Sequence, residues 1–140
     1  MIKITKGFIL ALVIGFFSSL IPTTIASAAN LLSPGTIVTC GEITTSGDYT
    51  VGADLSSPAG VNCLNIHDVS NVNLICNNHF ITSPGATGLS TSSIVVISSV
   101  TGFTVTGCKM VATNNTETAQ GQAIYIQNSK NGRLTGNVID

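Results

Sequence analysis

Three segments of the chain repeat one another, and this repetition limits the folds that the chain can adopt more than any other feature. They begin at Cys63, Ile94 and Ala123, so that the second interval is slightly shorter than the first, and they align without gaps over at least fourteen positions. They read CLNIHDVSNVNLIC, IVVISSVTGFTVTG and AIYIQNSKNGRLTG. A nearly fixed period of this length is typical of repeat architectures, in which successive units stack on one another.

Within each repeat, apolar residues alternate with polar ones, as they do in a β-strand with one buried face. The pattern predicts two short strands per repeat, joined by a polar corner at Asp68, Ser99 and Asn128. A repeat this short cannot bury its own apolar face, whereas stacking at a strand spacing of about 4.8 Å places like residues over like. We therefore expect an all-β parallel solenoid of about three turns. The columns expected to point inward are Leu64, Val95 and Ile124; Ile66, Ile97 and Ile126; Val72, Phe103 and Gly132; and Leu74, Val105 and Leu134.

Two segments rich in Gly, Ser, Thr and Asn connect the repeats, at 83–92 and 112–122. We expect them to be surface loops and to absorb the two-residue difference between the repeat periods. Repeat proteins commonly gather such loops on one face, and that face is often where ligands bind.

The N-terminal segment, 1–28, has the features of a secretory signal peptide. Lys3 and Lys6 precede an uncharged apolar run over 8–21, and the small residues of 26–28 form a cleavage signature. Cleavage is expected after Ala28 or one residue later, which predicts a secreted, periplasmic or cell-surface protein. The expected organisation is a signal peptide at 1–28, an N-terminal cap segment at 29–62 and solenoid turns over 63–140.

The mature chain is weakly acidic, which argues against two classes of partner. Removal of Lys3 and Lys6 leaves three basic and six acidic residues, a net charge of −3. So few cations offer no surface that neutralises the phosphates of a nucleic acid, and anionic membranes are disfavoured for the same reason. No membrane anchor is expected after cleavage, because the apolar run is shorter than the roughly 20 residues of a spanning helix.

A family resemblance begins with the stretch NVNLICNNHFI, residues 71–81. It resembles the N-V-T-L-D-x-N-G-H-x-I turn near the start of pectin-lyase-like right-handed parallel β-helix proteins. CGEITTSGDYTVGADL, residues 40–55, is similar to the N-terminal segment of bacterial secreted proteins that carry such repeats. The resemblance implies a right-handed parallel β-helix. It implies no single activity, since the superfamily includes lyases, hydrolases, epimerases and non-enzymatic surface proteins, and no catalytic residue is carried over.

Ile75, Cys76 and Asn78 depart from the family pattern. Asn78 stands where Gly is common, but Asn tolerates a left-handed corner, so the turn is expected to survive. The sequence stops at Asp140, just after the third repeat and without a polar cap, which predicts a truncated reading frame or a capping subunit. An uncapped apolar end also predicts self-association.

Five residues are candidates for ligand binding. His67 and Asp68 lie at the corner of the first repeat, where they can hydrogen-bond sugar hydroxyls or serve as acid and base. Lys130 and Arg133 suit a uronate carboxylate, since Arg recognises carboxylates in a bidentate manner. Tyr125 points outward on a strand and can stack on a sugar ring. Each also has a purely structural interpretation, as a solvated corner, an ordinary surface cation or a packed strand residue.

Four cysteines in an exported chain predict disulfides, with three possible pairings. A bond between Cys40 and Cys63 is favoured because it would join the cap segment to the first repeat. Cys76 and Cys108 are expected to lie close together in adjacent turns, and whether they are bonded is left open. The spacing shows no zinc pattern.

Together these features predict an exported β-helix that interacts with polysaccharide, with lyase, hydrolase or epimerase activity as the candidates for its complete form. Repeated side chains along the solenoid axis match a repeating polymer. The alternative is a non-catalytic surface or adhesive solenoid, since the chain lacks the paired carboxylates that sugar chemistry generally uses. Calcium is expected only if acidic ligands lie beyond Asp140.

Overall fold

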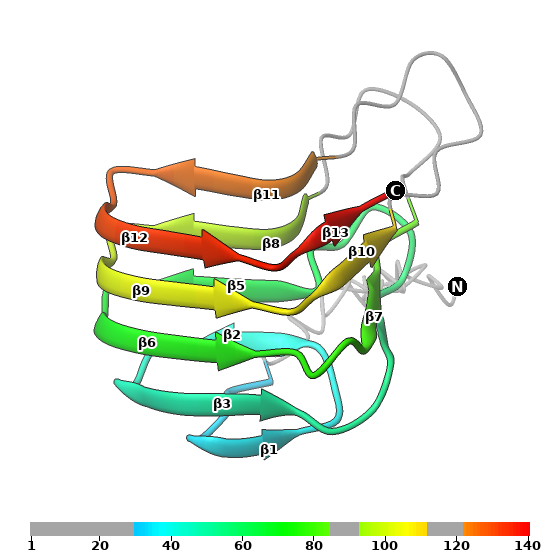
Figure 1. The fold of residues 1–140 in the computed structure, drawn as a ribbon, viewed down its shortest axis with the longest axis horizontal. Helices are drawn as coiled ribbons and strands as arrows, with labels where there is room; N and C mark the ends of the chain where they lie inside the picture. The colour runs from blue at the N-terminus through cyan, green and yellow to red at the C-terminus, as the bar shows by residue number, and fades with distance from the viewer. Residues whose placement is uncertain (1–29, 85–92, 112–121) are drawn as a thin grey trace, which may run out of the picture.

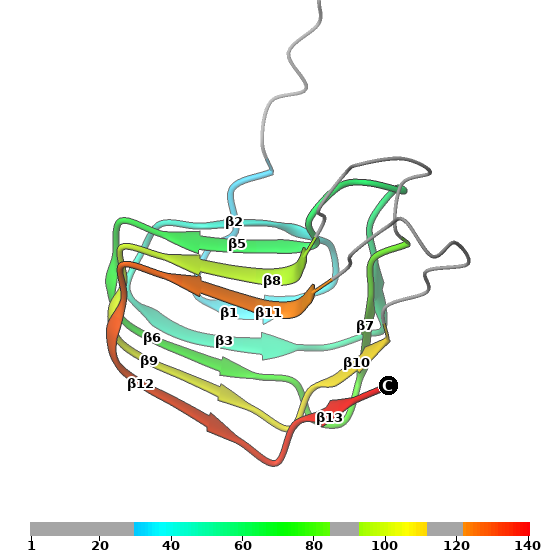
Figure 2. The ribbon, with the colours of Figure 1, turned by 90° about the horizontal axis from the view of Figure 1, so that it is seen from above.

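The computed structural model of the chain describes residues 30–84, 93–111 and 122–140, and these residues form strands and no helix. Their thirteen strands make up three parallel sheets, which we call sheets A, B and C. Each full turn of the chain passes through A, B and C in that order, and we call such a turn a coil (Figures 1 and 2). The predicted all-β parallel solenoid is confirmed. The predicted signal peptide lies outside the described residues.

Each sheet runs the length of the solenoid, because its neighbouring strands come from successive coils. In spatial order, sheet A consists of β11 (Gln122–Gln127), β8 (Ser93–Ser98), β5 (Leu64–His67) and β2 (Gly41–Ile43); sheet B of β1 (Gly35–Ile37), β3 (Gly47–Val51), β6 (Ser70–Ile75), β9 (Thr101–Thr106) and β12 (Lys130–Thr135); and sheet C of β13 (Val138–Ile139), β10 (Lys109–Val111), β7 (Phe80–Thr82) and β4 (Leu55–Ser56). No helix within these residues is long and apolar enough to cross a membrane.

The strand register confirms the alignment of the three repeats. Leu64 pairs with Val95, which pairs with Ile124, and the other predicted columns are paired in the same way. Leu64 and Val95 are fully buried. In the third repeat, by contrast, Ile126 and Leu134 are 44% and 47% exposed. These two side chains point along the predicted inward columns, but no further strand of the described residues lies over them.

Two features of the coils were not predicted. Each repeat contains a third strand, in sheet C, which at two or three residues is too short to show alternation. The predicted cap segment, 29–62, also forms a coil of the solenoid, because β2, β3 and β4 pair with β5, β6 and β7. Its apolar side chains, such as Ile43 and Tyr49, are buried in the common core.

The expectation that the connecting loops absorb the difference in period is wrong. Thr106 pairs with Ile75, and their separation along the chain equals the interval between the first two repeats. Lys109 pairs with Phe80, and this interval is two residues shorter. The first repeat therefore carries its two additional residues between β6 and β7, at 77–78. Both are asparagines with positive φ, of 51° and 63°, and Asn adopts this left-handed conformation more readily than other non-glycine residues. The two connections between paired strand ends, at 83–92 and 112–121, are equal in length.

The corner between sheets A and B uses left-handed residues in every repeat. The first left-handed residue lies directly after the strand of sheet A, and the second lies three positions further along the chain. Asn, Asp and Gly tolerate this conformation best, which explains their recurrence there. The φ angles are 51°, 56° and 50° at Asp68, Ser99 and Asn128, and 55°, 74° and 57° at Asn71, Gly102 and Asn131.

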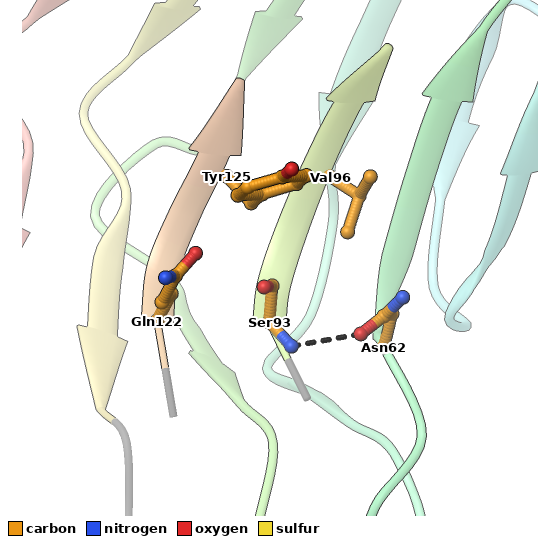
Figure 3. Close-up of a pocket in the computed structure, with 5 residues that line it drawn as sticks. All are labelled: Asn62, Ser93, Val96, Gln122 and Tyr125. Atoms are coloured by element: carbon orange, nitrogen blue, oxygen red, sulfur yellow. Dashed lines mark hydrogen bonds between the residues drawn. The ribbon is translucent and has the colours of Figure 1, made fainter. Parts of the chain in front are cut away.

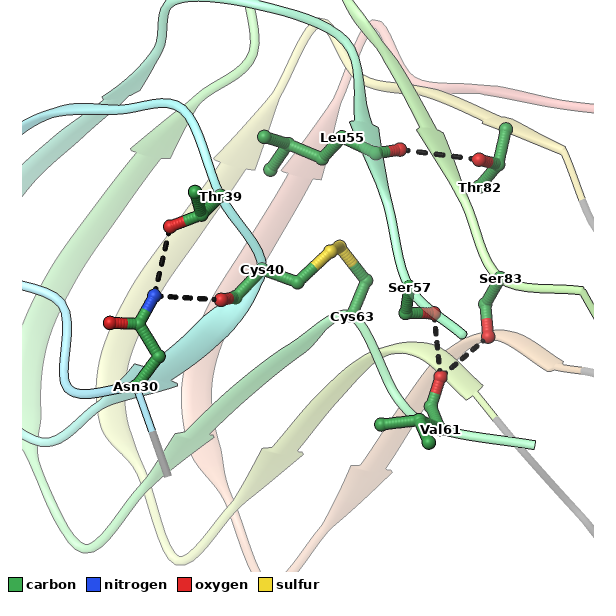
Figure 4. The surroundings of a disulfide bond; sticks show 9 residues. All are labelled: Asn30, Thr39, Cys40, Leu55, Ser57, Val61, Cys63, Thr82 and Ser83. Atoms are coloured by element: carbon green, nitrogen blue, oxygen red, sulfur yellow. Dashed lines mark hydrogen bonds between the residues drawn. A yellow bond between two sulfur atoms is a disulfide. The ribbon is translucent and has the colours of Figure 1, made fainter. Parts of the chain in front are cut away.

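Two disulfides join adjacent coils, and no described cysteine is free. Cys40 is bonded to Cys63, the pair that the sequence favours, and this bond links the first coil to the second (Figure 4). Beside it, the hydroxyls of Ser57 and Ser83 both donate to the Val61 carbonyl oxygen, at 2.7 and 2.8 Å. The bond left open by the sequence, Cys76–Cys108, is also formed. Two disulfides in a chain of this size are typical of extracellular proteins.

Candidate functional site

Sheet A carries a column of outward side chains that crosses all four of its strands. Glu42 pairs with Asn65, Asn65 with Val96, and Val96 with Tyr125. At a strand spacing of about 4.8 Å, the column is about 14 Å long and runs parallel to the solenoid axis. Its chemistry changes from a carboxylate at one end to an aromatic ring at the other.

Tyr125 forms one wall of a shallow pocket of about 420 Å³. Its ring lies across Val96 of the neighbouring strand, and Asn62, Ser93 and Gln122 complete the lining (Figure 3). Tyr125 is 40% exposed, so part of the ring is accessible to a ligand. An apolar surface flanked by a few oriented polar groups is the usual composition of a small-molecule binding site.

Asn62 is held in one orientation by two hydrogen bonds. Its Oδ1 accepts from the backbone N–H of Ser93, at 2.7 Å, and its Nδ2 donates to Oδ1 of Asn65, at 3.2 Å. Asn62 also lines a second depression, of about 410 Å³, whose walls include Asn65 and Glu42. The two depressions share Asn62 in their linings, and we refer to them together as the sheet A groove. This sheet A groove is defined by Glu42, Asn62, Asn65, Ser93, Val96, Gln122 and Tyr125.

His67 lies beside the acidic end of the sheet A groove, between two carboxylates. Its Nε2 is 3.6 Å from Oε2 of Glu42, and its Nδ1 is 3.1 Å from Oδ2 of Asp68. Contacts on both ring nitrogens restrict the orientation of the imidazole. The Asp68 side chain is 77% exposed and stands at the left-handed corner that follows β5.

The chain was compared with family models, curated proteins and solved structures. Nothing among them matches it. Any function of the sheet A groove is therefore inferred from its geometry and chemistry.

The structure separates the five predicted binding residues into two groups. Tyr125 lines the sheet A groove, and His67 and Asp68 lie beside its other end. Lys130 and Arg133 belong to β12 in sheet B, which faces a different direction (Figure 2). The sequence did not predict that these two groups would lie on different faces, because it does not show how far the chain turns at the corner.

Arg133 lies at one end of a polar column on sheet B. Thr104, Asn73 and Asp48 follow it in successive coils, and all four residues line a depression of about 370 Å³. The acid and the base lie at opposite ends of this column, three strands apart. They therefore do not form an ion pair with each other, and we assign no ligand to this face.

Sheet C carries a cluster of charged and aromatic side chains. The backbone N–H of Phe80 donates to Oδ1 of Asp54 at 2.9 Å, and Nδ1 of His79 lies 3.2 Å from the same oxygen. These contacts, the backbone hydrogen bond first, lower the pKa of Asp54. Nζ of Lys109 lies 5.2 Å from the centre of the Phe80 ring, a cation–π geometry. His79 thus joins β7 to the preceding coil.

Glu42, Asn62 and Asn65 were missed by the sequence analysis. Asn65 shares a column with Tyr125 in the repeat alignment, so the alignment contained a signal for it. Glu42 belongs to the cap segment, which that alignment does not include. Among the residues that the structure describes, no group of three or more His, Cys, Asp or Glu is arranged to hold a metal ion.

Proposed function

We propose that this chain is an exported protein that binds polysaccharide through the sheet A groove. The observation that carries this proposal is the axial column from Glu42 to Tyr125, which combines an accessible aromatic ring with oriented amide groups. A tyrosine ring offers an apolar face to the C–H groups of a sugar, and amides donate to and accept from its hydroxyls.

The fold that we propose is a right-handed β-helix of the pectin-lyase-like type. Three parallel sheets with short coils and left-handed corner residues support it, together with the stretch at 71–81. Export is supported by the two disulfides and by the signal-peptide features of 1–28. The protein then acts in the periplasm, at the cell surface or in the medium.

Affinity electrophoresis through gels that contain dissolved polysaccharides tests the binding function. At least one polymer is expected to retard the protein, and Tyr125→Ala is expected to weaken binding about tenfold, since aromatic contacts contribute about 1 kcal/mol beyond their area. Phe80→Ala is the matched control, because Phe80 is similarly exposed, at 43%, but lies on sheet C. Retardation by no polymer, or equal effects of the two variants, would exclude the sheet A groove as the binding site.

A further inference from the structure

The chemistry of the sheet A groove also indicates which class of polysaccharide it accepts. We infer that the groove binds a neutral, extended glycan that lies along the solenoid axis, from Tyr125 to Glu42. This inference rests on the proposed polysaccharide binding and adds the charge and the direction of the ligand. Each of these two properties follows from a separate observation.

The charge of the ligand follows from the ionisable groups that line the groove. Among the described residues of its two depressions, Glu42 is the acidic one, and Lys and Arg are absent. Asp68 adds a second carboxylate beside His67, at the same end. The cations Lys130 and Arg133 are placed on sheet B instead. A uronate laid in the groove would bring its carboxylates toward Glu42 with no Lys or Arg in the lining to compensate, whereas neutral hydroxyls can donate to that carboxylate.

The direction of the ligand follows from the strand register. Tyr125, Val96, Asn65 and Glu42 occupy one column that crosses the strands, so the recognition groups follow one another along the axis and not along a strand. Asn62 continues the polar lining between the two depressions. The column spans about 14 Å, which corresponds to three strand steps and accommodates about three sugar units of an extended chain.

Isothermal titration calorimetry with oligosaccharides tests the charge. The probes are cello-, manno- and xylo-oligosaccharides and, as the acidic set, oligogalacturonates of equal length. At least one neutral hexasaccharide is expected to bind at least about tenfold more tightly than the oligogalacturonate. Glu42→Gln is expected to narrow this gap severalfold by removing the repulsion. Asp48→Asn is the matched control, because it removes a carboxylate from the same coil but on sheet B.

The length dependence of the same titrations tests the direction. Affinity is expected to rise from disaccharide to trisaccharide and then to level off. Glu42→Ala is expected to weaken tetrasaccharide binding severalfold and to leave disaccharide binding unchanged, whereas Tyr125→Ala weakens both. An effect of Glu42→Ala that is equal for both lengths, or absent for both, overturns the axial placement.

Different results would overturn the proposed polysaccharide binding and the inference that the ligand is neutral. Tighter binding of oligogalacturonate that is lost in Tyr125→Ala overturns the neutral ligand while leaving polysaccharide binding at the sheet A groove intact. If no oligosaccharide binds, or if binding is insensitive to Tyr125→Ala, the proposed function fails and this inference fails with it.

Discussion

The backbone of Gly132 lies directly over the ring of Phe103 in the preceding coil. A Cβ atom at position 132 would overlap Cζ, Cε1 and Cε2 of that ring. Gly132 and Phe103 pair in sheet B, in the column that Val72 begins. A large side chain in one coil is thus accommodated by the missing side chain in the next.

Gly132→Ala is expected to destabilise the protein by about 2 kcal/mol, because the Phe103 ring would have to leave its rotamer or push β12 away. The measurement is the urea midpoint of the purified protein. In a Phe103→Leu background the same substitution is expected to cost much less, since the shorter side chain leaves room for the methyl group. Equal costs in both backgrounds would show that steric overlap with Phe103 is not the cause.

Removal of the Cys40–Cys63 disulfide is expected to lower stability by about 3 kcal/mol, through the greater freedom of the unfolded chain. The double variant Cys40→Ser with Cys63→Ser is compared with the native protein in denaturant under non-reducing conditions. The two cysteines are well separated in the chain, and the bond links the first coil to the second. Mass analysis after thiol labelling supplies the control: four reactive thiols in the native protein would contradict both disulfides.

Acidification is expected to remove the contribution of Asp54. Its pKa is lowered in the folded protein, chiefly by the hydrogen bond from the Phe80 backbone and then by His79. A lowered pKa contributes stability that is present above the ordinary Asp pKa of about 3.9 and is lost as pH falls through the folded value. Asp54→Asn is therefore expected to lower the thermal midpoint at pH 7. The difference from the native protein should shrink as the pH falls below about 4, and a constant difference would contradict this origin.

Ser98 and Ser99 offer a matched pair that isolates backbone conformation. Ser99 has a φ of 56°, whereas Ser98 lies in the regular strand β8. Ser99→Gly is expected to stabilise the protein or leave it unchanged, because the strain of about 1 kcal/mol in a left-handed non-glycine residue offsets the entropy cost of glycine. Ser98→Gly is expected to destabilise it by about 1 kcal/mol, since only the entropy cost remains. A greater loss for Ser99→Gly than for Ser98→Gly, by thermal denaturation, would refute the role of the corner conformation.

The sequence predicted the parts of this fold that repeat. Alternation and alignment placed Leu64, Val95 and Ile124 in one column, and asparagine chemistry anticipated the left-handed conformation of Asn78. It missed the strands of sheet C because two or three residues contain no period. It also placed the period difference in the loops, because alignment of the first two strands alone shows the length of a coil and not where extra residues lie.

The candidate site was predicted only in part, for a geometric reason. Tyr125 was recognised from its own chemistry as an outward aromatic residue. Its partners Asn65 and Glu42 belong to much earlier parts of the chain, two and three coils away, and they lie in line with it only because coils stack in register. Glu42 in addition belongs to a coil whose sequence does not resemble the repeats. Contacts of this kind depend on the pairing of whole coils, which local patterns do not reveal.

The corners of the solenoid and the connections from sheet C to sheet A differ in how readily they tolerate a change in length. At the corner between sheets B and C, the two-residue extension at 77–78 consists of left-handed asparagines, so further changes of length there are restricted to few residue types. The connections from sheet C back to sheet A begin and end at paired positions, whatever sequence they carry. For a flexible loop, doubling the length costs only about 0.6 kcal/mol of closure entropy. Foreign peptides are therefore best inserted at these connections if the solenoid is to serve as a display scaffold.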